Sequence, residues 1–210
     1  MGDLRDLYRK YNSDKGDRGK NAHHYYLEYE QEFMKKRNDP INILEVGIFK
    51  GTSFDAHHEY FPNANLYGID IFTRLQPRDV PALQKDRVDY IKADSLDPAT
   101  PKRIENIWGV QFDFIIDDGL HTPDANRITF ENLIPLLKDD GIYYIEDAWP
   151  LHIMTSKEMS DPWIRAKQDR YTTDKMGKFM KSLDPYRVGE IDLRGVSGRP
   201  DSYIFKVRKP

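Results

Sequence analysis

Apolar residues recur at helical spacing over the first forty positions of the chain. Around the first dozen residues they lie three and four positions apart, which predicts a short amphipathic helix. Residues 12–21 are polar and contain glycine, so we expect a loop there, and a second helix over about residues 24–36. The apolar positions are Leu4, Leu7, Tyr8 and Tyr11 in the first helix and Tyr25, Tyr26, Tyr29 and Phe33 in the second.

From residue 41 onward the pattern changes to strands that alternate with helices. Near-continuous apolar runs are typical of strands buried on both faces of a parallel sheet, and we place five of them at residues 41–46, 65–71, 88–92, 112–117 and 141–146. Helical spacing of apolar residues predicts helices around residues 54–61, 101–108 and 126–137. The proline-containing segment 72–87 predicts a long loop with at most one helical turn.

The last third of the chain departs from this alternation. Residues 147–170 form a long stretch between elements, and loops of this length in compact domains are usually functional, so we expect a lid over a pocket. A helix is predicted at about residues 173–183, and residues 186–193 and 202–207 predict an antiparallel hairpin. The whole pattern predicts one α/β domain, doubly wound around a mostly parallel seven-stranded sheet with a C-terminal antiparallel hairpin.

The composition narrows the classes of partner. A formal net charge of −3, from 32 basic and 35 acidic side chains, argues against nucleic acid, because phosphate contacts leave a basic footprint. The chain has no cysteine, which excludes disulfides, thiolate metal sites and a cysteine nucleophile. No apolar leader follows Met1 and no run approaches the ~20 apolar residues that span a bilayer. We therefore expect a cytoplasmic protein without a membrane partner.

A glycine turn after the first strand is the most informative motif. Gly47 and Gly51 separate a buried strand from a helix, and such turns bind ligands in doubly wound sheets. A dinucleotide fingerprint would need glycine in place of Glu45 and Lys50. A carboxylate at Glu45 would repel a pyrophosphate, but it suits the ammonium group of an amino acid such as the methionyl end of S-adenosylmethionine.

The next two strands also end in polar residues. Asp70 ends the second strand, where an acid can accept hydrogen bonds from ribose hydroxyls, and Asp94 and Ser95 follow the third. Three polar termini in register favour a nucleoside pocket, with a tight turn and solvated strand ends as the plain alternative. The cofactor-binding residues expected from this edge are Glu45, Gly47, Gly51, Thr52, Ser53, Asp70, Asp94 and Ser95.

Acidic residues end the fourth and fifth strands, which are neighbours in the usual topology. Asp118 follows the fourth strand, and Glu146 and Asp147 follow the fifth. Three carboxylates so close would repel each other unless a cation lay among them. Because only oxygen ligands are offered, we expect a hard cation, Mg²⁺ before Mn²⁺ or Ca²⁺. The alternative is that these acids cap the helices that follow.

His121 lies three residues beyond Asp118, on the loop that enters the next helix. A histidine near neutral pKa beside a metal can take the proton from a hydroxyl that the metal has acidified. We therefore expect His121 and Asp118 to be the catalytic residues. The other histidines considered, which we expect at the surface without a role, are His57, His58 and His152.

These motifs resemble the class I S-adenosylmethionine-dependent methyltransferases and, within them, the magnesium-dependent macrolide sugar O-methyltransferases of the mycinamicin and tylosin pathways. The class resemblance covers about residues 41–147 and rests on Glu45-x-Gly47-x-x-x-Gly51, Asp70 and Asp94. The subgroup resemblance rests on Ser13-Asp14-Lys15, His23-x-Tyr25-x-x-x-Tyr29-Glu30, Tyr67-Gly68-x-Asp70-Ile71-Phe72, Asp117-Asp118-Gly119-x-His121 and Ile145-Glu146-Asp147.

The resemblance implies a Rossmann-like methyltransferase fold and a set of roles. Asp118, Glu146 and Asp147 would hold Mg²⁺, the metal would bind vicinal sugar hydroxyls, His121 would be the general base, and homo-oligomers would form. We divide the single domain 1–210 into a helical cap (1–40), a cofactor-binding core (41–147), a lid or acceptor loop (148–172) and a C-terminal helix and hairpin (173–210). The residues added by resemblance are Tyr25, Ile71 and Asp117 at the cofactor and His23 at the substrate. Trp149 lies just beyond the acidic pair of the fifth strand, and we expect it to line the acceptor pocket.

The expected reaction is methyl transfer to a sugar hydroxyl, as of a deoxysugar such as rhamnose in a glycan or glycoside. A catechol acceptor is an alternative, since vicinal phenols chelate Mg²⁺ as vicinal sugar hydroxyls do. An iron-dependent oxidoreductase is a second, because cephalosporin-hydroxylase-like sequences resemble this group and His121 could ligate iron. A non-catalytic binding module would not need the acidic cluster. Tyr25, Tyr26 and Tyr29 also fit a helix face that packs on the core, and for Tyr29 this is the better interpretation. For Trp149, burial under the loop is as good an interpretation as contact with the acceptor.

Overall fold

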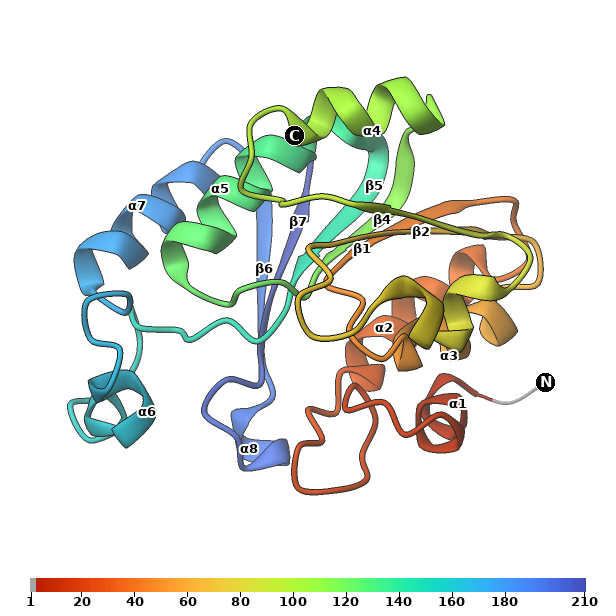
Figure 1. Cartoon of the computed structure of the whole chain (residues 1–210). Coiled ribbons are helices and arrows are strands. Elements are labelled where there is room, and N and C mark those ends of the chain that lie inside the picture. Colours follow the sequence, from red (N-terminus) through yellow and green to blue (C-terminus); the bar gives the residue numbers. More distant parts are fainter. Residues whose placement is uncertain (1–2) are drawn as a thin grey trace.

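The computed structural model describes residues 3–210 and arranges them around a seven-stranded sheet (Figure 1). The strand order is β3-β2-β1-β4-β5-β7-β6. Pairs among β1 to β5 are parallel, whereas β7 is antiparallel to both β5 and β6. The predicted α/β sheet with a C-terminal antiparallel hairpin is confirmed. The strands are β1 (Asn42–Val46), β2 (Asn65–Asp70), β3 (Val88–Lys92), β4 (Phe112–Asp117), β5 (Leu137–Ile145), β6 (Arg187–Asp192) and β7 (Tyr203–Arg208).

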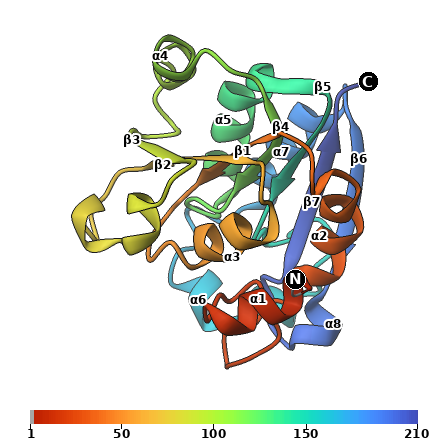
Figure 2. The same cartoon turned by 90° about the vertical axis from the view of Figure 1, so that its right-hand side faces the viewer.

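Helices cover both faces of the sheet (Figures 1 and 2). One layer consists of α4 (Thr100–Trp108), α5 (Pro123–Leu133) and α7 (Thr173–Leu183), and the other of α1 (Leu4–Lys10), α2 (Tyr26–Phe33) and α3 (Thr52–Tyr60). Successive side chains of a strand point to opposite faces. Leu44 and Ile115 accordingly join the core under the first layer, whereas Ile43 and Phe114 join the core under the second. The continuous apolar runs in the sequence therefore reflect strands buried on both faces.

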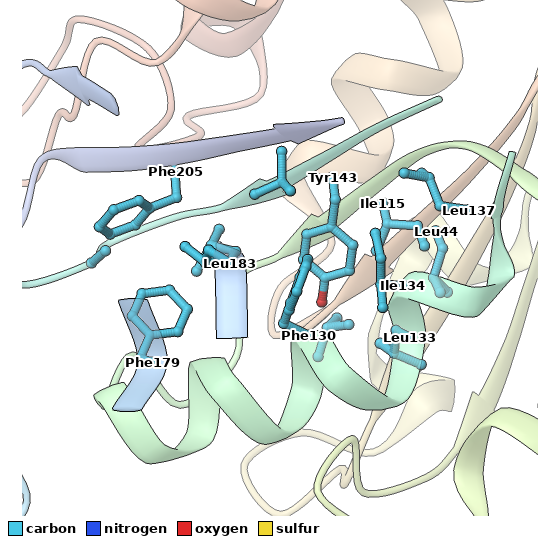
Figure 3. Close-up of a cluster of buried hydrophobic side chains, with 14 of the residues drawn as sticks. Leu44, Ile115, Phe130, Leu133, Ile134, Leu137, Tyr143, Phe179, Leu183 and Phe205 are labelled. Atoms are coloured by element: carbon cyan, nitrogen blue, oxygen red, sulfur yellow. The ribbon is translucent and has the colours of Figure 1, made fainter. Parts of the chain in front are cut away.

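The core under α5 and α7 fixes the strands that lead to the acidic residues (Figure 3). The Phe130 ring of α5 meets the Tyr143 ring of β5 edge-on with centroids 5.2 Å apart. Phe179 of α7 packs on Phe205 of β7 in the same way, also at 5.2 Å. Burying each large apolar side chain stabilises the fold by roughly 1.5–3 kcal/mol. This layer packs on β5 and β7, whose backbone pairing places Ile145 opposite Phe205 near the carboxyl end of β5.

Several element boundaries differ from the sequence predictions. The second helix begins at Tyr26 rather than at about His24, because His24 has a φ of 63° that no α-helix accepts, and it ends in a 3₁₀ turn, η1 (Met34–Lys36). Strand β5 begins at Leu137 instead of residue 141. The expectation of at most one helical turn in segment 72–87 is wrong. It holds two 3₁₀ helices, η2 (Pro77–Asp79) and η3 (Pro81–Gln84), each started by a proline whose missing N–H costs nothing there.

The remaining segments complete the chain. The part of the N-terminal helix prediction that falls on Met1 and Gly2 lies outside the described residues. Residues 134–136 form η4 (Ile134–Leu136). The predicted lid contains η5 (Glu158–Ser160) and α6 (Pro162–Arg165), and α8 (Arg194–Ser197) joins the hairpin strands. Over residues 3–210, no helix is both long and apolar enough to cross a bilayer.

Candidate functional site

The carboxyl ends of β1 and β4 meet in the middle of the sheet, where the strand order reverses. Open α/β sheets bind ligands at such a switch point. Val46 pairs with Asp117, and Asp117 pairs with Ile145, so the residues that follow the three strands are neighbours. Gly47 has a φ of 87°, and a Cβ there would lie 2.2 Å from the carbonyl oxygen of Asp118. Only glycine allows the two strand ends to approach this closely.

Glu45 brings a buried carboxylate to the glycine turn. Its side chain is 3% exposed, and the Ser53 hydroxyl at the start of α3 donates to its Oε1 at 2.6 Å. Burial raises the pKa of Glu45 to about 7, and the nearby Lys15 ammonium opposes this rise. The group is therefore poised to gain from a cation that binds beside it. The structure places Glu45, Gly47 and Ser53 together, as predicted.

Asp70 fastens the turn after β1 to the turn after β2. Its Oδ2 accepts from the backbone N–H groups of Ile48 (2.8 Å) and Phe49 (3.2 Å), and its Oδ1 accepts from that of Phe72 (2.6 Å). Ile71, beside it, is 47% exposed at the same edge. Asp70 thus shapes the loop that the prediction assigns to the cofactor.

The other predicted cofactor residues line the same edge of the sheet. Asp94 is exposed, and its Oδ1 accepts from the backbone N–H of Leu96, while the Ser95 hydroxyl bonds that of Thr129 on α5. Gly51 precedes α3 with a φ of 71°, and Thr52 is the first residue of that helix. Within residues 3–210, neither Asp94 nor Ser95 makes a hydrogen bond or ion pair with Glu45. Both residues follow β3, which is separated from β1 by β2 in the sheet.

Asp117 is buried and incompletely satisfied. Its Oδ1 accepts from the Gly119 N–H at 3.3 Å, whereas its Oδ2 has no hydrogen-bond partner within residues 3–210. Burial raises the pKa of Asp117 to about 7, with His121 acting in the opposite direction. A buried acceptor without a donor is costly unless a ligand or water supplies one.

Asp118, His121 and Asp147 form a group that can hold a metal ion. One ligand atom from each residue lies within 4.8 Å of the others, and His121 Nε2 lies 3.7 Å from Asp118 Oδ1. His121 and Asp147 have φ values of 57° and 51°. Such left-handed backbone is unfavourable for side-chain-bearing residues and is concentrated at functional sites.

The charges of this group shift its pKa values in opposite directions. Burial lowers the pKa of His121, but the carboxylates of Asp147, Asp118 and Asp117 and a backbone hydrogen bond at Glu146 together raise it overall. Burial raises the pKa of Asp147 to about 6, and His121 moderates the rise. Burial raises the pKa of Asp118, but the positive charges of Lys15 and His121 oppose burial, and the pKa is lowered overall. The group therefore holds more negative charge than its own histidine can balance.

Glu146 does not join this group, although we expected it as a ligand together with Asp118 and Asp147. Its two oxygens accept from the Tyr29 hydroxyl and from the Lys15 ammonium, and the residue is 1% exposed. The reason is the alternation of side chains in β5, which turns Glu146 to the same face as Tyr144, toward α2. The third member of the group that can hold a metal is His121, which we expected to be the general base, and not Glu146.

Lys15 is a buried residue of the site to which sequence reasoning assigned no role. It is 2% exposed, and its Nζ lies 2.6 Å from Asp118 Oδ2, 3.8 Å from Glu45 Oε1 and within hydrogen-bonding distance of Glu146. The Ser13-Asp14-Lys15 motif was the available signal, but a lysine in a polar loop does not reveal that it is buried. Tyr29 has a double role, because its ring is core and its hydroxyl reaches Glu146.

Three further predictions fall on buried residues. The Tyr25 hydroxyl donates to Asp147 Oδ1 at 2.6 Å, so it contacts the acid after β5 and not the glycine turn. His23, expected at the substrate, is 2% exposed; its Nδ1 lies 3.0 Å from Ser202 Oγ, and burial lowers its pKa to about 4. Trp149 is 6% exposed and stacks on Trp163 with ring centroids 4.9 Å apart, which agrees with burial under the loop.

The expectation that His57 lies at the surface is wrong. It is 1% exposed, its Nε2 lies 2.7 Å from the Tyr8 hydroxyl, and burial lowers its pKa to about 3. The physical reason is its position three residues after Phe54, on the inner face of α3. His58 and His152 instead pair with Asp86 and Glu190 near the surface.

Known proteins resemble the chain in sequence, although no family model matches it. The 8-demethyl-8-(2-methoxy-alpha-L-rhamnosyl)-tetracenomycin-C 3'-O-methyltransferase of Streptomyces olivaceus is 30% identical over 156 residues, which are 70% of this chain and 37% of the relative. Demethylmacrocin O-methyltransferase of Streptomyces fradiae is 28% identical over 208 residues, 96% of this chain and 48% of the relative. The chain is a homologue of these O-methyltransferases. It spans less than half of the length of either one.

Solved structures agree on the architecture. The MycE methyltransferase from the mycinamycin biosynthetic pathway, in complex with Mg and SAH, superposes with a TM-score of 0.71 at 23% identity and covers 100% of this chain and 55% of its own. The Podospora anserina methyltransferase PaMTH1, bound to SAH, gives a TM-score of 0.64 at 16% identity and covers 100% of this chain and 89% of its own. At these identities the likeness shows the fold, which is that of class I methyltransferases.

Proposed function

We propose that the chain is an S-adenosylmethionine-dependent and magnesium-dependent O-methyltransferase that acts on a sugar hydroxyl. The observation that carries the proposal is the meeting, at one switch point, of the buried Glu45 carboxylate beside the glycine turn with the Asp118, His121 and Asp147 group. The Glu45 carboxylate can bind the ammonium group of the methionyl end of S-adenosylmethionine. The Asp118, His121 and Asp147 group can hold a divalent cation beside a general base. The homologous O-methyltransferases, one of them named for a rhamnosyl compound, support the sugar.

The residues of the glycine turn fit S-adenosylmethionine. Glu45 offers a buried carboxylate for the ammonium group, and a charge-assisted bond there is about twice as strong as a neutral one. The unpartnered Oδ2 of Asp117 offers a further acceptor. Asp70 lies with the exposed Ile71 on the next strand end, where a nucleoside would extend from the turn. Glu45, Asp117 and Asp70 thus offer acceptors toward the carboxyl ends of β1, β4 and β2.

The donor set fits magnesium. Mg²⁺ is usually held by one or two protein carboxylates and keeps several waters, which matches Asp118 and Asp147. A nitrogen from His121 would suit Mn²⁺ as well. In the proposed arrangement the two aspartates hold the cation and His121 remains the base. Glu146 becomes a third ligand only by giving up its contact with Lys15 or Tyr29.

When bound, the cation would acidify the acceptor hydroxyl, and the cofactor would supply the methyl group from its sulfonium. His121 accepts the hydroxyl proton at Nε2. Its raised pKa comes from Asp147 and Asp118, so the ring becomes a base once the charge of these carboxylates is offset. Tyr25 steadies Asp147, and the Tyr171 hydroxyl donates to the carbonyl of His121 at 3.2 Å. These contacts hold the group in place for proton transfer.

The test is a transfer assay with labelled S-adenosylmethionine, a panel of deoxysugar glycosides that includes rhamnosides, and a parallel panel of catechols. We expect methylation of a glycoside in Mg²⁺ and its loss in EDTA, with recovery when Mg²⁺ is restored. Transfer that continues unchanged in EDTA would contradict the metal. Absence of cofactor binding in calorimetry would contradict the class, and transfer to catechols alone would replace the sugar by the phenolic alternative.

A further inference from the structure

The Lys15 side chain brings a buried positive charge to the centre of the site. It comes from the polar segment between α1 and α2, and it reaches carboxylates at three strand ends, namely Glu45 of β1, Asp118 after β4 and Glu146 after β5. Burial of a lysine is expensive unless carboxylates surround it. Lys15 Nζ donates to Asp118 and Glu146 and lies 3.8 Å from Glu45 Oε1, so the surrounding carboxylates favour its charged ammonium form.

The backbone around Lys15 is fastened to the start of α2. The Lys15 carbonyl accepts from the N–H of Tyr26 at 3.2 Å, and the Asp14 carbonyl accepts from that of His23 at 2.7 Å. Glu146, which the Tyr29 hydroxyl also binds, gives the ammonium a second anchor. Because both the main chain and the amine of Lys15 are held, the position of Nζ relative to Asp118 is restrained.

The two oxygens of Asp118 have different partners. Oδ2 accepts from Lys15 Nζ at 2.6 Å, and Oδ1 lies 3.7 Å from His121 Nε2 in the group that can hold a metal. A carboxylate fixed through one oxygen presents the other in a defined direction. Tyr25 holds Asp147 through Oδ1 in a similar way. Each aspartate of the group thus has its own anchor from the N-terminal segment.

We propose that Lys15 is a positioning residue for the metal, whose ammonium binds Oδ2 of Asp118 and thereby aims Oδ1 at the cation. This inference rests on the proposed function, since it requires a cation at Asp118 and Asp147. Partners of metal-ligating carboxylates typically change metal affinity by about 10- to 100-fold when they are removed. A pure charge effect has the opposite sign, because removal of a positive neighbour favours the binding of a cation.

The experiment measures Mn²⁺ binding by electron paramagnetic resonance, in the absence of cofactor, for the wild-type chain and for Lys15→Met. The control variant is Lys20→Met, which removes an exposed lysine from the same segment. We expect Mn²⁺ affinity to fall about 10- to 100-fold in Lys15→Met and to stay unchanged in the control. S-adenosylhomocysteine affinity, measured by calorimetry, should change less than about threefold, because Glu45 keeps its Ser53 partner. High Mg²⁺ should restore most of kcat.

Equal or tighter Mn²⁺ binding by Lys15→Met would overturn the inference, since Lys15 would then act only through its charge. Loss of S-adenosylhomocysteine affinity with unchanged Mn²⁺ affinity would also overturn it and would assign Lys15 to the cofactor. Circular dichroism checks the fold. If Lys15→Met does not fold, Lys15→Gln is measured, and failure of both to fold would show that Lys15 serves the fold instead. A wild-type chain that binds no Mn²⁺ would refute the proposed metal function itself.

Discussion

The two sides of the switch point are built differently. On the β1 to β3 side, carboxylates are held by backbone N–H groups or by near neighbours in the chain, as Asp70 is by Ile48 and Glu45 by Ser53, eight residues away. On the β4 to β5 side, Asp118 and Glu146 are held by side chains more than 100 positions away in the sequence, from Lys15 and Tyr29. The first side is mostly local structure, and the second is assembled by the N-terminal segment.

Under the proposed function, this difference separates cofactor binding from the chemistry of methyl transfer. On the side that we assign to the cofactor, the donors to Asp70 are backbone N–H groups, which are present whatever the side chains of those residues are. This side therefore needs few particular side chains beyond its acids. The side that we assign to the metal depends on buried charges whose partners must all be present, and buried polar networks lose much when one member is removed. Substitutions that act on one side and spare the other would sharpen this comparison.

The largest effect is expected for Asp118→Asn, which keeps the shape of the side chain and removes its charge. We expect methyl transfer to fall on the order of 10³-fold, because both cation and base lose their partner. Cofactor affinity should change less than about threefold, since the hydrogen bond between the Asp118 N–H and the Val46 carbonyl is kept. Steady-state kinetics measure methyl transfer and calorimetry measures cofactor affinity, with Asp139→Asn at the surface as the control variant. Loss of cofactor binding in Asp118→Asn would erase the distinction between the two sides.

An intermediate effect is expected for Glu45→Gln, which removes the carboxylate proposed to bind the ammonium. We expect S-adenosylhomocysteine affinity to fall about 10- to 100-fold near pH 8, the range for a lost hydrogen bond to a charged group. Calorimetry checks this value, and Glu105→Gln on the exposed side of α4 is the matched control.

The pH dependence of binding tests the same residue. Burial raises the pKa of Glu45 from 4.5 to about 7. The protonated form is favoured in the folded chain, so the contribution of this group to stability is present below pH 4.5 and is lost as the pH rises through about 7. Binding of an ammonium has the opposite sign, because it needs the carboxylate. Affinity should therefore rise with pH up to about 7 and then level off, and a wild-type profile as flat as that of Glu45→Gln would disprove the assignment.

The smallest effect is expected for Asp70→Asn. An amide accepts backbone N–H bonds more weakly than a carboxylate, and three such bonds converge on Asp70. We expect the free energy of unfolding to fall by about 1 kcal/mol and cofactor affinity to fall by no more than about tenfold, with kcat at saturation unchanged. Thermal unfolding and calorimetry provide the readouts. A loss of kcat would mean that the β2 edge contributes to the chemistry.

The fold was largely accessible to pattern reasoning, because strands buried on both faces produce apolar runs that a short window of sequence contains. The terminal hairpin and α7 were also predicted at nearly their observed bounds. The failures have local causes that a pattern does not show. The positive φ of His24 makes α2 begin later in the chain than predicted. Pro77 and Pro81 begin short 3₁₀ helices in a segment where a long loop was expected.

The doubly wound sheet, the glycine turn at Gly47 and the acids at the strand ends could be predicted from the amino-acid sequence, because each follows from residues adjacent in the chain. The contacts of those acids depend on the three-dimensional packing. The side-chain alternation of β5 directs Glu146 to Tyr29 and Lys15, while left-handed backbone at Asp147 and His121 brings both to Asp118. Partners more than 100 residues apart are brought together by packing, and no local pattern encodes which carboxylate a buried lysine will meet.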